Sequence, residues 1–146
     1  MLSIMDKCNS VELLKSNGLR RTPGRRIVLD RFIKSDMPLS AQQLHRKVSR
    51  QSNIDLATVY RIIKILLDRE IIREAGIQGN VQYYEMACEH NPAHPHFECT
   101  QCHKLYCLSP TRLENTKMYE SAKSVGDITE TIIEFRGICS QCLKKR

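Results

Sequence analysis

Four cysteines of this chain form two pairs whose spacing suits a metal ion. Cys99 and Cys102 are separated by two residues, and Cys139 and Cys142 repeat the same spacing. A tight turn lets two thiolates at this spacing reach one tetrahedral ion, and a second pair closes the coordination shell without leaving an open position for catalysis. The sequence therefore predicts a structural zinc site made by these four cysteines, with a redox or disulfide role as the alternative.

A second group of metal donors lies within residues 88–103, around the first cysteine pair. His94 and His96 are two positions apart, so on an extended segment both rings point to the same side and can converge on one ion. Cys88 precedes them by six residues, and a thiolate favours zinc over iron or manganese. The sequence offers three candidates for a fourth donor: Glu74, Glu85 and His90. The competing interpretation is that these loop histidines are only solvated.

Cysteines and histidines outside these patterns do not add a catalytic site. Cys8 and Cys107 have no partner at a metal-binding spacing, and we interpret them as ordinary buried or surface thiols. His96 and Glu98, followed by the second cysteine pair, match part of the zinc-deaminase signature. Ile138 stands where that signature has proline, and the first cysteine pair would have no role in it. No catalytic residue and no enzymatic activity are predicted.

The positive charge is concentrated in the first half of the chain. Residues 1–80 contain 15 Lys and Arg against 8 Asp and Glu, a net charge of +7, whereas residues 81–146 contain 8 of each. A basic region favours polyanionic partners, most simply nucleic acid. The asymmetry predicts a basic DNA-binding domain at residues 1–86 and a metal-binding domain at residues 87–146.

Two further features bear on cellular location. The first residues, Met1 to Met5, lack a charged segment followed by a long apolar run, which a secretory signal needs. No apolar run approaches the roughly 20 residues that span a membrane, and seven cysteines in an unsecreted chain indicate metal ligands before disulfides. We expect a cytoplasmic protein.

Hydrophobic spacing predicts the elements that position the basic residues. One helix is expected over residues 6–17, a second from Pro23, which follows the N-cap residue Thr22, and a third from Ser40. Residues 57–69 give the clearest helical pattern, because their apolar side chains share one face while Tyr60, Arg61 and Lys64 lie largely off it.

These helices and the residues after them predict a winged helix. A helix, a short turn and a second helix with exposed Tyr and Arg near its start is the helix-turn-helix layout. Strands at 71–75 and 81–86 flank Gly76 and Gly79 and are expected to form a hairpin.

The second half is predicted to contain strands around the metal donors. Strands are expected at 97–99, 105–108 and 131–135. A helix is expected at about 110–124, with Leu113, Met118 and Ala122 on its buried side.

Together these residues resemble the ferric-uptake regulator (Fur) family of metal-dependent repressors over nearly the whole chain. Residues 18–26, Gly-Leu-Arg-Arg-Thr-Pro-Gly-Arg-Arg, are similar to the N-terminal segment of the family. Residues 57–61, Ala-Thr-Val-Tyr-Arg, are close to its recognition-helix signature. Residues 94–102 contain its metal-binding core, and the second cysteine pair completes its structural site.

The resemblance implies an α+β fold, with an N-terminal winged helix-turn-helix domain followed by a C-terminal α/β dimerisation domain that holds the structural four-cysteine zinc site. It implies a homodimer that binds a double-stranded DNA operator and whose regulatory metal lies at the hinge. The implied DNA-binding residues are Arg20, Thr58, Tyr60 and Arg61.

Within the family, the sequence is similar to zinc-uptake regulators, whose site uses an acidic residue, a cysteine and two histidines. The matching residues here are Glu74, Cys88, His94 and His96. Pro38 stands about where iron sensors have a metal-binding histidine, and His103 replaces the usual glycine after the first cysteine pair. We expect a zinc-responsive repressor of metal-uptake genes. An iron- or manganese-responsive repressor, including the peroxide sensors, is the alternative, and a zinc-ribbon module that binds a protein partner is the rival outside the family.

Overall fold

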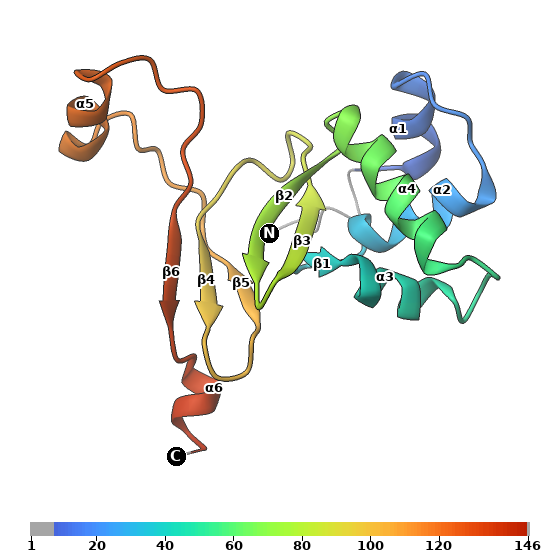
Figure 1. Cartoon of the computed structure of the whole chain (residues 1–146). Helices are drawn as coiled ribbons and strands as arrows, with labels where there is room; N and C mark the ends of the chain where they lie inside the picture. Colours follow the sequence, from blue (N-terminus) through green and yellow to red (C-terminus); the bar gives the residue numbers. More distant parts are fainter. Residues whose placement is uncertain (1–7, 146) are drawn as a thin grey trace. The chain divides into compact units, whose positions relative to one another are not determined.

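The computed structural model describes residues 8–145. The predictions made for Met1 to Met5, and for residues 6 and 7 of the first helix, lie outside the described residues. The chain divides into two compact units between Pro92 and Ala93, and each unit contains a three-stranded sheet (Figure 1). The helices found among residues 8–145 are all too short or too polar to cross a membrane.

The helices of the first unit begin where polar side chains cap them. Their bounds are α1 Ser10–Ser16, α2 Pro23–Ile33, α3 Ala41–Val48 and α4 Leu56–Asp68. The predicted starts at Thr22 and Ser40 are confirmed, since both residues cap their helices, and Ser40 forms a reciprocal capping box with Gln43. Asp55 caps α4 by accepting a hydrogen bond from the Thr58 N–H at 2.7 Å.

An antiparallel sheet completes the first unit. Its strands are β1 Leu39–Ser40, β2 Ile72–Gln78 and β3 Val81–Met86, in the order β1-β3-β2. Gly79 and Asn80 have φ values of 52° and 65°, the left-handed conformation that a tight hairpin turn requires. β2 is longer than predicted, because it continues through Gly76 with a register shift between Glu74 and Gly76.

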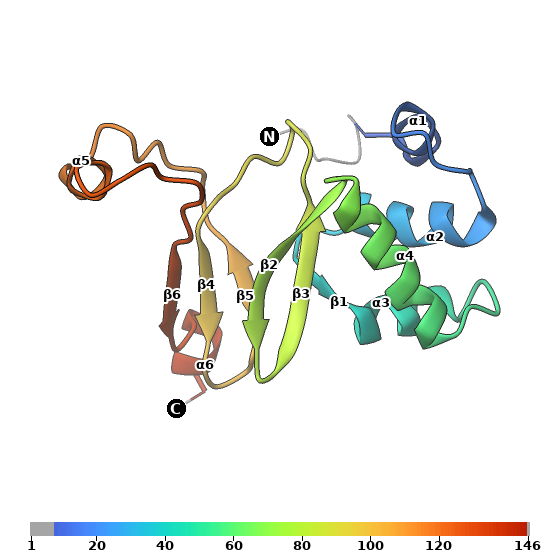
Figure 2. The same ribbon diagram turned by 45° about the horizontal axis from the view of Figure 1, so that its top comes forward.

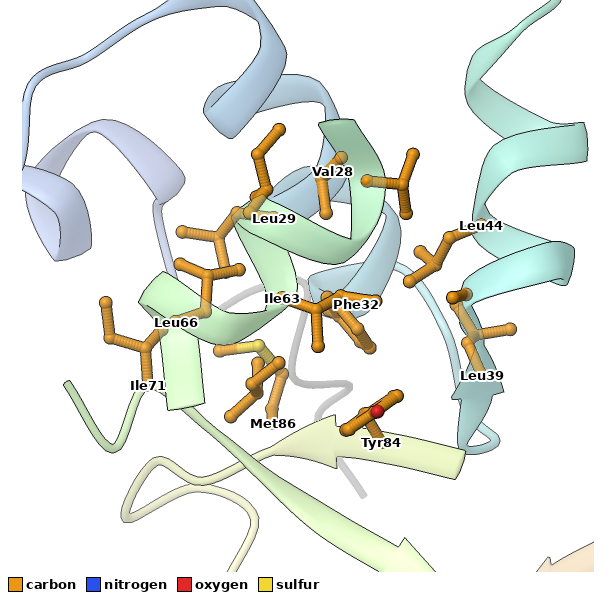
Figure 3. Close-up of a cluster of buried hydrophobic side chains, with 14 of the residues drawn as sticks. Val28, Leu29, Phe32, Leu39, Leu44, Ile63, Leu66, Ile71, Tyr84 and Met86 are labelled. Atoms are coloured by element: carbon orange, nitrogen blue, oxygen red, sulfur yellow. The ribbon is translucent and has the colours of Figure 1, made fainter. Parts of the chain in front are cut away.

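The core of the first unit lies between its helices and its sheet. Figure 3 shows Leu29, Phe32, Ile63 and Leu66 of α2 and α4 packed together, with Met86 of β3 beside them. None of these five side chains is more than 2% exposed. The apolar face predicted for α4 is therefore the face that this core buries.

The second unit is built around β4, its central strand. The strands are β4 His96–Cys99, β5 Leu105–Cys107 and β6 Glu134–Gly137, and their order is β5-β4-β6. β5 pairs antiparallel with β4, whereas β6 pairs parallel with it. A short helix, α6 Ser140–Leu143, follows β6. The last strand begins at Glu134, three residues later than predicted.

The long helix predicted at about 110–124 is wrong. The structure has only α5 Lys117–Lys123, capped by Thr116, and no residue of this helix is buried. Met118 is 63% exposed, Ala122 is exposed, and Leu113 lies before the helix. Figure 2 shows α5 apart from the sheet of its own unit. The apolar residues therefore do not pack within the chain, and only the capped final turns form a helix.

Candidate metal centres and nucleic-acid interface

The second unit brings the four paired cysteines together. Cys99 ends β4 and Cys102 follows it in the turn, while Cys139 and Cys142 lie at the start and middle of α6. The Sγ atoms of Cys99 and Cys142 are 3.9 Å apart, and those of Cys102 and Cys139 are 3.8 Å apart. Sulfurs on one tetrahedral zinc, with bonds of about 2.3 Å, are about 3.8 Å apart. The donors therefore fit a four-thiolate zinc site and are too far apart for disulfides.

Backbone amides favour a thiolate at the centre of this cluster. The N–H groups of Cys102 and Cys139 donate to Cys99 Sγ at 3.5 Å and 3.3 Å. These hydrogen bonds lower the pKa of the Cys99 thiol to about 6. Burial instead raises the pKa of Cys142 to about 12, so this fourth thiolate needs a cation. A zinc ion would hold all four cysteines as thiolates and stabilise the fold, with no open position for a reaction.

The backbone around these cysteines is tightly constrained. His103, which stands in place of the family's usual glycine, has a φ of 58°. This left-handed conformation costs a residue with a Cβ more than it costs glycine. Gly137 lies opposite Cys99 in β6, and a Cβ there would meet the Phe97 ring at 3.2 Å. The site thus tolerates the side chain of His103 in a turn that favours glycine. At Gly137, by contrast, packing against Phe97 requires glycine.

A second set of donors in the same unit consists of His94, His96 and Cys107. Their ligand atoms lie within 4.8 Å of one another. Cys107 is directly opposite His96 in the antiparallel pair of β4 and β5, and the ring centroids of His94 and His96 are 4.7 Å apart. The convergence predicted for the two histidines is present. Cys107, which we interpreted as an ordinary buried or surface thiol, is exposed, and strand pairing brings it close to both histidines.

The other two predicted donors, Glu74 and Cys88, belong to the first unit. Glu74 is exposed on β2, opposite Tyr84. The Sγ of Cys88 lies 3.4 Å from the Sγ of Cys8, so Cys8 also has a partner that its position in the sequence did not indicate. The four-residue set of Glu74, Cys88, His94 and His96 takes residues from both units and stays a prediction.

The alternative fourth donors, Glu85 and His90, also belong to the first unit, and their part in metal binding stays a prediction. Glu85 is 5% exposed, and its carboxylate accepts a hydrogen bond from Arg73 Nε at 2.8 Å. The same guanidinium donates to the backbone carbonyls of Asn91 and Pro92 at 2.9 Å and 3.0 Å. His90 lies 3.6 Å from the carboxylate of Glu89. Arg73 thus holds the segment after β3 against the hairpin.

The predicted DNA-binding residues of α4 lie on its outer surface. Tyr60 is 45% exposed, and its hydroxyl accepts a hydrogen bond from the Gln42 side chain of α3 at 3.2 Å. Arg61 is exposed, and its guanidinium donates to the Thr58 hydroxyl at 3.1 Å. Arg20 is exposed in the segment before α2. The side chains predicted to contact DNA are therefore available to a partner and partly preoriented.

Comparison with known proteins agrees with this arrangement of helices, sheets and cysteines. The description "Ferric uptake regulator family" belongs to a family model that matches residues 16–135. This chain is a member of the ferric uptake regulator family. The resemblance drawn from the sequence is thereby confirmed, and so is the coarser prediction of a metal-responsive, DNA-binding transcription regulator.

Three proteins illustrate the likeness of this Fur-family chain to others. The ferric uptake regulation protein of Staphylococcus epidermidis (strain ATCC 12228) is 30% identical over 142 residues, which cover 97% of this chain and 99% of that protein. The peroxide-responsive repressor PerR of Staphylococcus saprophyticus is 26% identical over 138 residues, 94% of this chain and 91% of the relative. The ferric uptake regulator Fur of Helicobacter pylori superimposes with a TM-score of 0.75 at 22% identity, over 97% of this chain and 92% of that one. This last likeness supports the mixed α and β fold.

Proposed function

We propose that this Fur-family protein is a zinc-responsive repressor of metal-uptake genes, acting in the cytoplasm. The observation that carries the proposal is the meeting of two imidazoles and one thiol, from His94, His96 and Cys107, in the second unit. Nitrogen and sulfur donors together suit zinc, whereas iron and manganese prefer nitrogen and oxygen donors. A thiolate in the sensing site therefore favours zinc.

The regulatory donor set that we propose contains both histidines and at least one thiolate. Cys107 is supported by its position beside His96, and Cys88 by the family's order of zinc ligands. Glu74 is the oxygen donor that this order supplies. The structural zinc is assigned separately to the four paired cysteines, whose sulfur separations suit one tetrahedral ion.

DNA binding is assigned to the first unit, acting as a winged helix. α3 and α4 are the two helices of the helix-turn-helix, and the β2–β3 hairpin is the wing. Arg61 is placed to reach a base edge from α4, with Thr58 holding its guanidinium, and Tyr60 is placed beside it. Arg20 and Arg21 before α2, together with Arg25 and Arg26 in its first turn, supply phosphate or minor-groove contacts. The net charge of +7 in residues 1–80 supports this role.

A homodimer is assigned to the second unit. Large apolar side chains there remain exposed in this single chain, including Met118 at 63%, Val125 at 89%, Ile132 at 76% and Phe135 at 52%. Phe135 lies on β6, which is an edge strand of its sheet. Several large, exposed apolar side chains on a small unit favour a surface that another chain covers, and a second copy accounts for them.

An iron- or manganese-responsive repressor is the second candidate function. It is favoured by the names of the similar proteins, a ferric uptake regulation protein and a peroxide-responsive repressor. In that case the two histidines would bind metal with oxygen donors, and neither Cys88 nor Cys107 would contribute.

The test is DNA binding measured by fluorescence anisotropy with the upstream region of the protein's own gene. Free zinc is buffered in one series, and ferrous iron or manganese is supplied anaerobically in another. The proteins are the wild type, Cys107→Ser, Cys88→Ser and Arg61→Ala. Retention of the structural zinc, measured by metal analysis, shows that each variant is folded in its second unit.

Zinc alone should induce tight binding by the wild type. Loss of a thiolate ligand should raise the free zinc concentration needed for DNA binding. Mutation of a group that only supports a metal ligand typically weakens metal binding by about 10–100-fold, so loss of a ligand itself should raise this concentration by at least that factor. Arg61→Ala should bind zinc normally but lose about 1–3 kcal/mol of sequence discrimination if Arg61 contacts a base. Activation by iron or manganese, with both cysteine variants unaffected, would overturn the zinc assignment and support the second candidate.

A further inference from the structure

Two cysteines that lie outside both zinc-type clusters of the second unit face each other in the first unit. Cys8 and Cys88 are 80 positions apart in the chain, yet their Sγ atoms are 3.4 Å apart. Both thiols are half-buried, and both pack against the edge of the first unit's apolar core. Two free thiols at this distance need only a small movement to form a covalent bond.

The local backbone permits that movement. A disulfide requires an S–S distance of about 2.05 Å, so the sulfurs must approach by roughly 1.4 Å. Cys8 precedes α1, and Cys88 lies in a bend after β3, so neither belongs to a helix or a strand. On the Cys88 side the bend is held in place, because the Asn91 N–H donates to the Cys88 carbonyl at 2.9 Å and the Asn91 side chain donates to the Met86 carbonyl at 2.8 Å. The movement therefore falls to the Cys8 side.

A small oxidant has access to the Cys8 side of the pair, while Cys88 is half-buried. Cys8 borders an open cavity of about 240 Å³ whose charged lining residues are Arg26, Asp30 and Lys34. This volume accommodates several water-sized molecules, and a hydroperoxide such as hydrogen peroxide is little larger than water. The pair thus combines proximity, backbone freedom and access from solvent.

We propose that Cys8 and Cys88 form a redox modification site, in which a hydroperoxide converts the two thiols to an intramolecular disulfide. The proposal goes beyond metal sensing and concerns the protein while Cys88 holds no metal ion.

The chemistry balances with one peroxide. The Cys88 sulfur, as a thiolate, attacks one peroxide oxygen, the O–O bond breaks, and Cys88 becomes a sulfenic acid while hydroxide leaves and takes up a proton. The Cys8 sulfur then attacks the Cys88 sulfur, the S–O bond breaks and the S–S bond forms. The departing hydroxide takes the Cys8 proton and leaves as water. Two thiols lose two electrons and two protons, and one hydrogen peroxide becomes two waters.

Cys8 suits the second role because its sulfur lies 3.4 Å from that of Cys88 and because it belongs to no helix or strand. The four paired cysteines are expected to react more slowly, because zinc occupies their sulfur lone pairs.

The test uses the full chain with zinc in its four-cysteine site. The protein is treated with one equivalent of hydrogen peroxide, its free thiols are blocked with iodoacetamide, and it is digested without reduction for mass spectrometry. A peptide pair linked through Cys8 and Cys88 should be the first disulfide to form, with zinc still bound. Dithiothreitol should restore both thiols. A first disulfide between other cysteines, or zinc release that precedes the Cys8–Cys88 link, would overturn the proposal.

A variant and a second readout separate this site from general oxidation. In Cys8→Ser, oxidation of Cys88 should stop at the sulfenic acid, which dimedone traps, and the linked peptide should disappear. In the wild type, the disulfide closes an 80-position separation within the first unit, so the thermal unfolding midpoint of that unit should rise on oxidation. No rise in the wild type, or an equal rise in Cys8→Ser, would show that the link does not form in the folded protein.

Discussion

Different interactions stabilise the interior of each of the two units. The first buries a contiguous set of aliphatic and aromatic side chains from α2, α3, α4 and its sheet. The buried cluster of the second consists of Cys99, Cys139 and Cys142, with three partly buried side chains around them. Its helix α5 contributes no buried residue. The first unit thus resembles an ordinary small domain, whereas the second depends on its sulfur atoms.

This contrast shows how a chain of this length can maintain two functional units. A small unit with little apolar core needs a further source of stability, and a structural metal is a common one. Binding of a structural zinc contributes on the order of 10 kcal/mol, which is comparable to the whole stability of a typical domain. The cysteine pairs therefore take the role in the second unit that Leu29, Phe32 and Leu66 have in the first.

The largest expected effect comes from removing the structural metal. Strong chelation should unfold the second unit and leave the first folded, because only the second relies on thiolate–metal bonds. Amide NMR spectra before and after chelation should lose the dispersed resonances of residues 96–142 and keep those of α2 and α4. Zinc added back should restore them. Loss of both sets together would mean that the units are not independently stable.

A substitution in the apolar core of the first unit should destabilise that unit, by less than metal removal destabilises the second unit. Leu66→Ala removes a fully buried side chain and should lower the free energy of unfolding of the first unit by about 2–5 kcal/mol. Met37→Ala, at a position that is 40% exposed, is the control and should stay within about 0.5 kcal/mol of the wild type. Chemical denaturation followed by helical circular dichroism measures both. Equal effects of the two substitutions would contradict the core described for this unit.

Acidification should lower the stability of the second unit at a higher pH than that of the first. This effect should be smaller than the previous two and gradual. Hydrogen bonds from backbone amides lower the pKa of Cys99 from 9.0 to about 6. The stability that this thiolate supplies to the metal-free second unit is therefore full above pH 9, falls as the pH decreases, and is gone below about 6. The concentration of free zinc that refolds the second unit, followed by its dispersed amide resonances, should therefore rise as the pH decreases from 9 to 6. No rise over this range would exclude this role of Cys99.

In the first unit, Asp55 at the start of α4 is the group whose lowered pKa makes stability depend on pH, as Cys99 does in the second unit. Hydrogen bonds from Thr58 lower the pKa of its carboxyl below the ordinary 3.8. Its contribution is therefore full above pH 3.8 and is lost only as the pH falls through the still lower pKa of the folded state. Asp55→Asn, which keeps the cap without the charge, should remove this pH dependence. The helical signal of the first unit should thus survive acid that has already weakened the second.

The sequence predicted best those features that depend on local spacing. The helix starts at Thr22 and Ser40 and the apolar face of α4 follow from capping and from helical periodicity, and they are present in the structure. The closeness of the two cysteines within each pair also follows from spacing, because Cys102 lies in the turn after Cys99, and Cys139 and Cys142 are three residues apart at the start of α6. These features need no knowledge of the tertiary fold.

Features that depend on strand register were missed. Cys107 meets His96 only because β5 pairs antiparallel with β4 in one register, and a shift of one residue would turn its side chain to the other face. Cys8 meets Cys88 through the packing of the first unit, across 80 positions of sequence. The alternation of residues 105–107 and their place after the first cysteine pair were the available signals for Cys107, but the sequence does not indicate the register.

The helix predicted at about 110–124 failed for a related reason. Leu113, Met118 and Ala122 have a spacing that suits a buried face, and the sequence does not reveal whether that face packs within the chain. In this chain it has no partner, and Met118 is largely exposed. An apolar pattern on a helix identifies a surface that will be covered, but it does not identify what covers it.

The parallel pairing of β4 with β6 also sets the order in which the protein can mature during synthesis. Cys102 leaves the ribosome 37 residues before its neighbour Cys139. At about 5–20 residues per second, this interval lasts about 2–7 s. During that time, two thiols that are meant to share one ion have only half of their binding site. A metal ion that binds during this interval therefore meets only the first two of the four thiols, and the site is complete only after the last strand and α6 have been made.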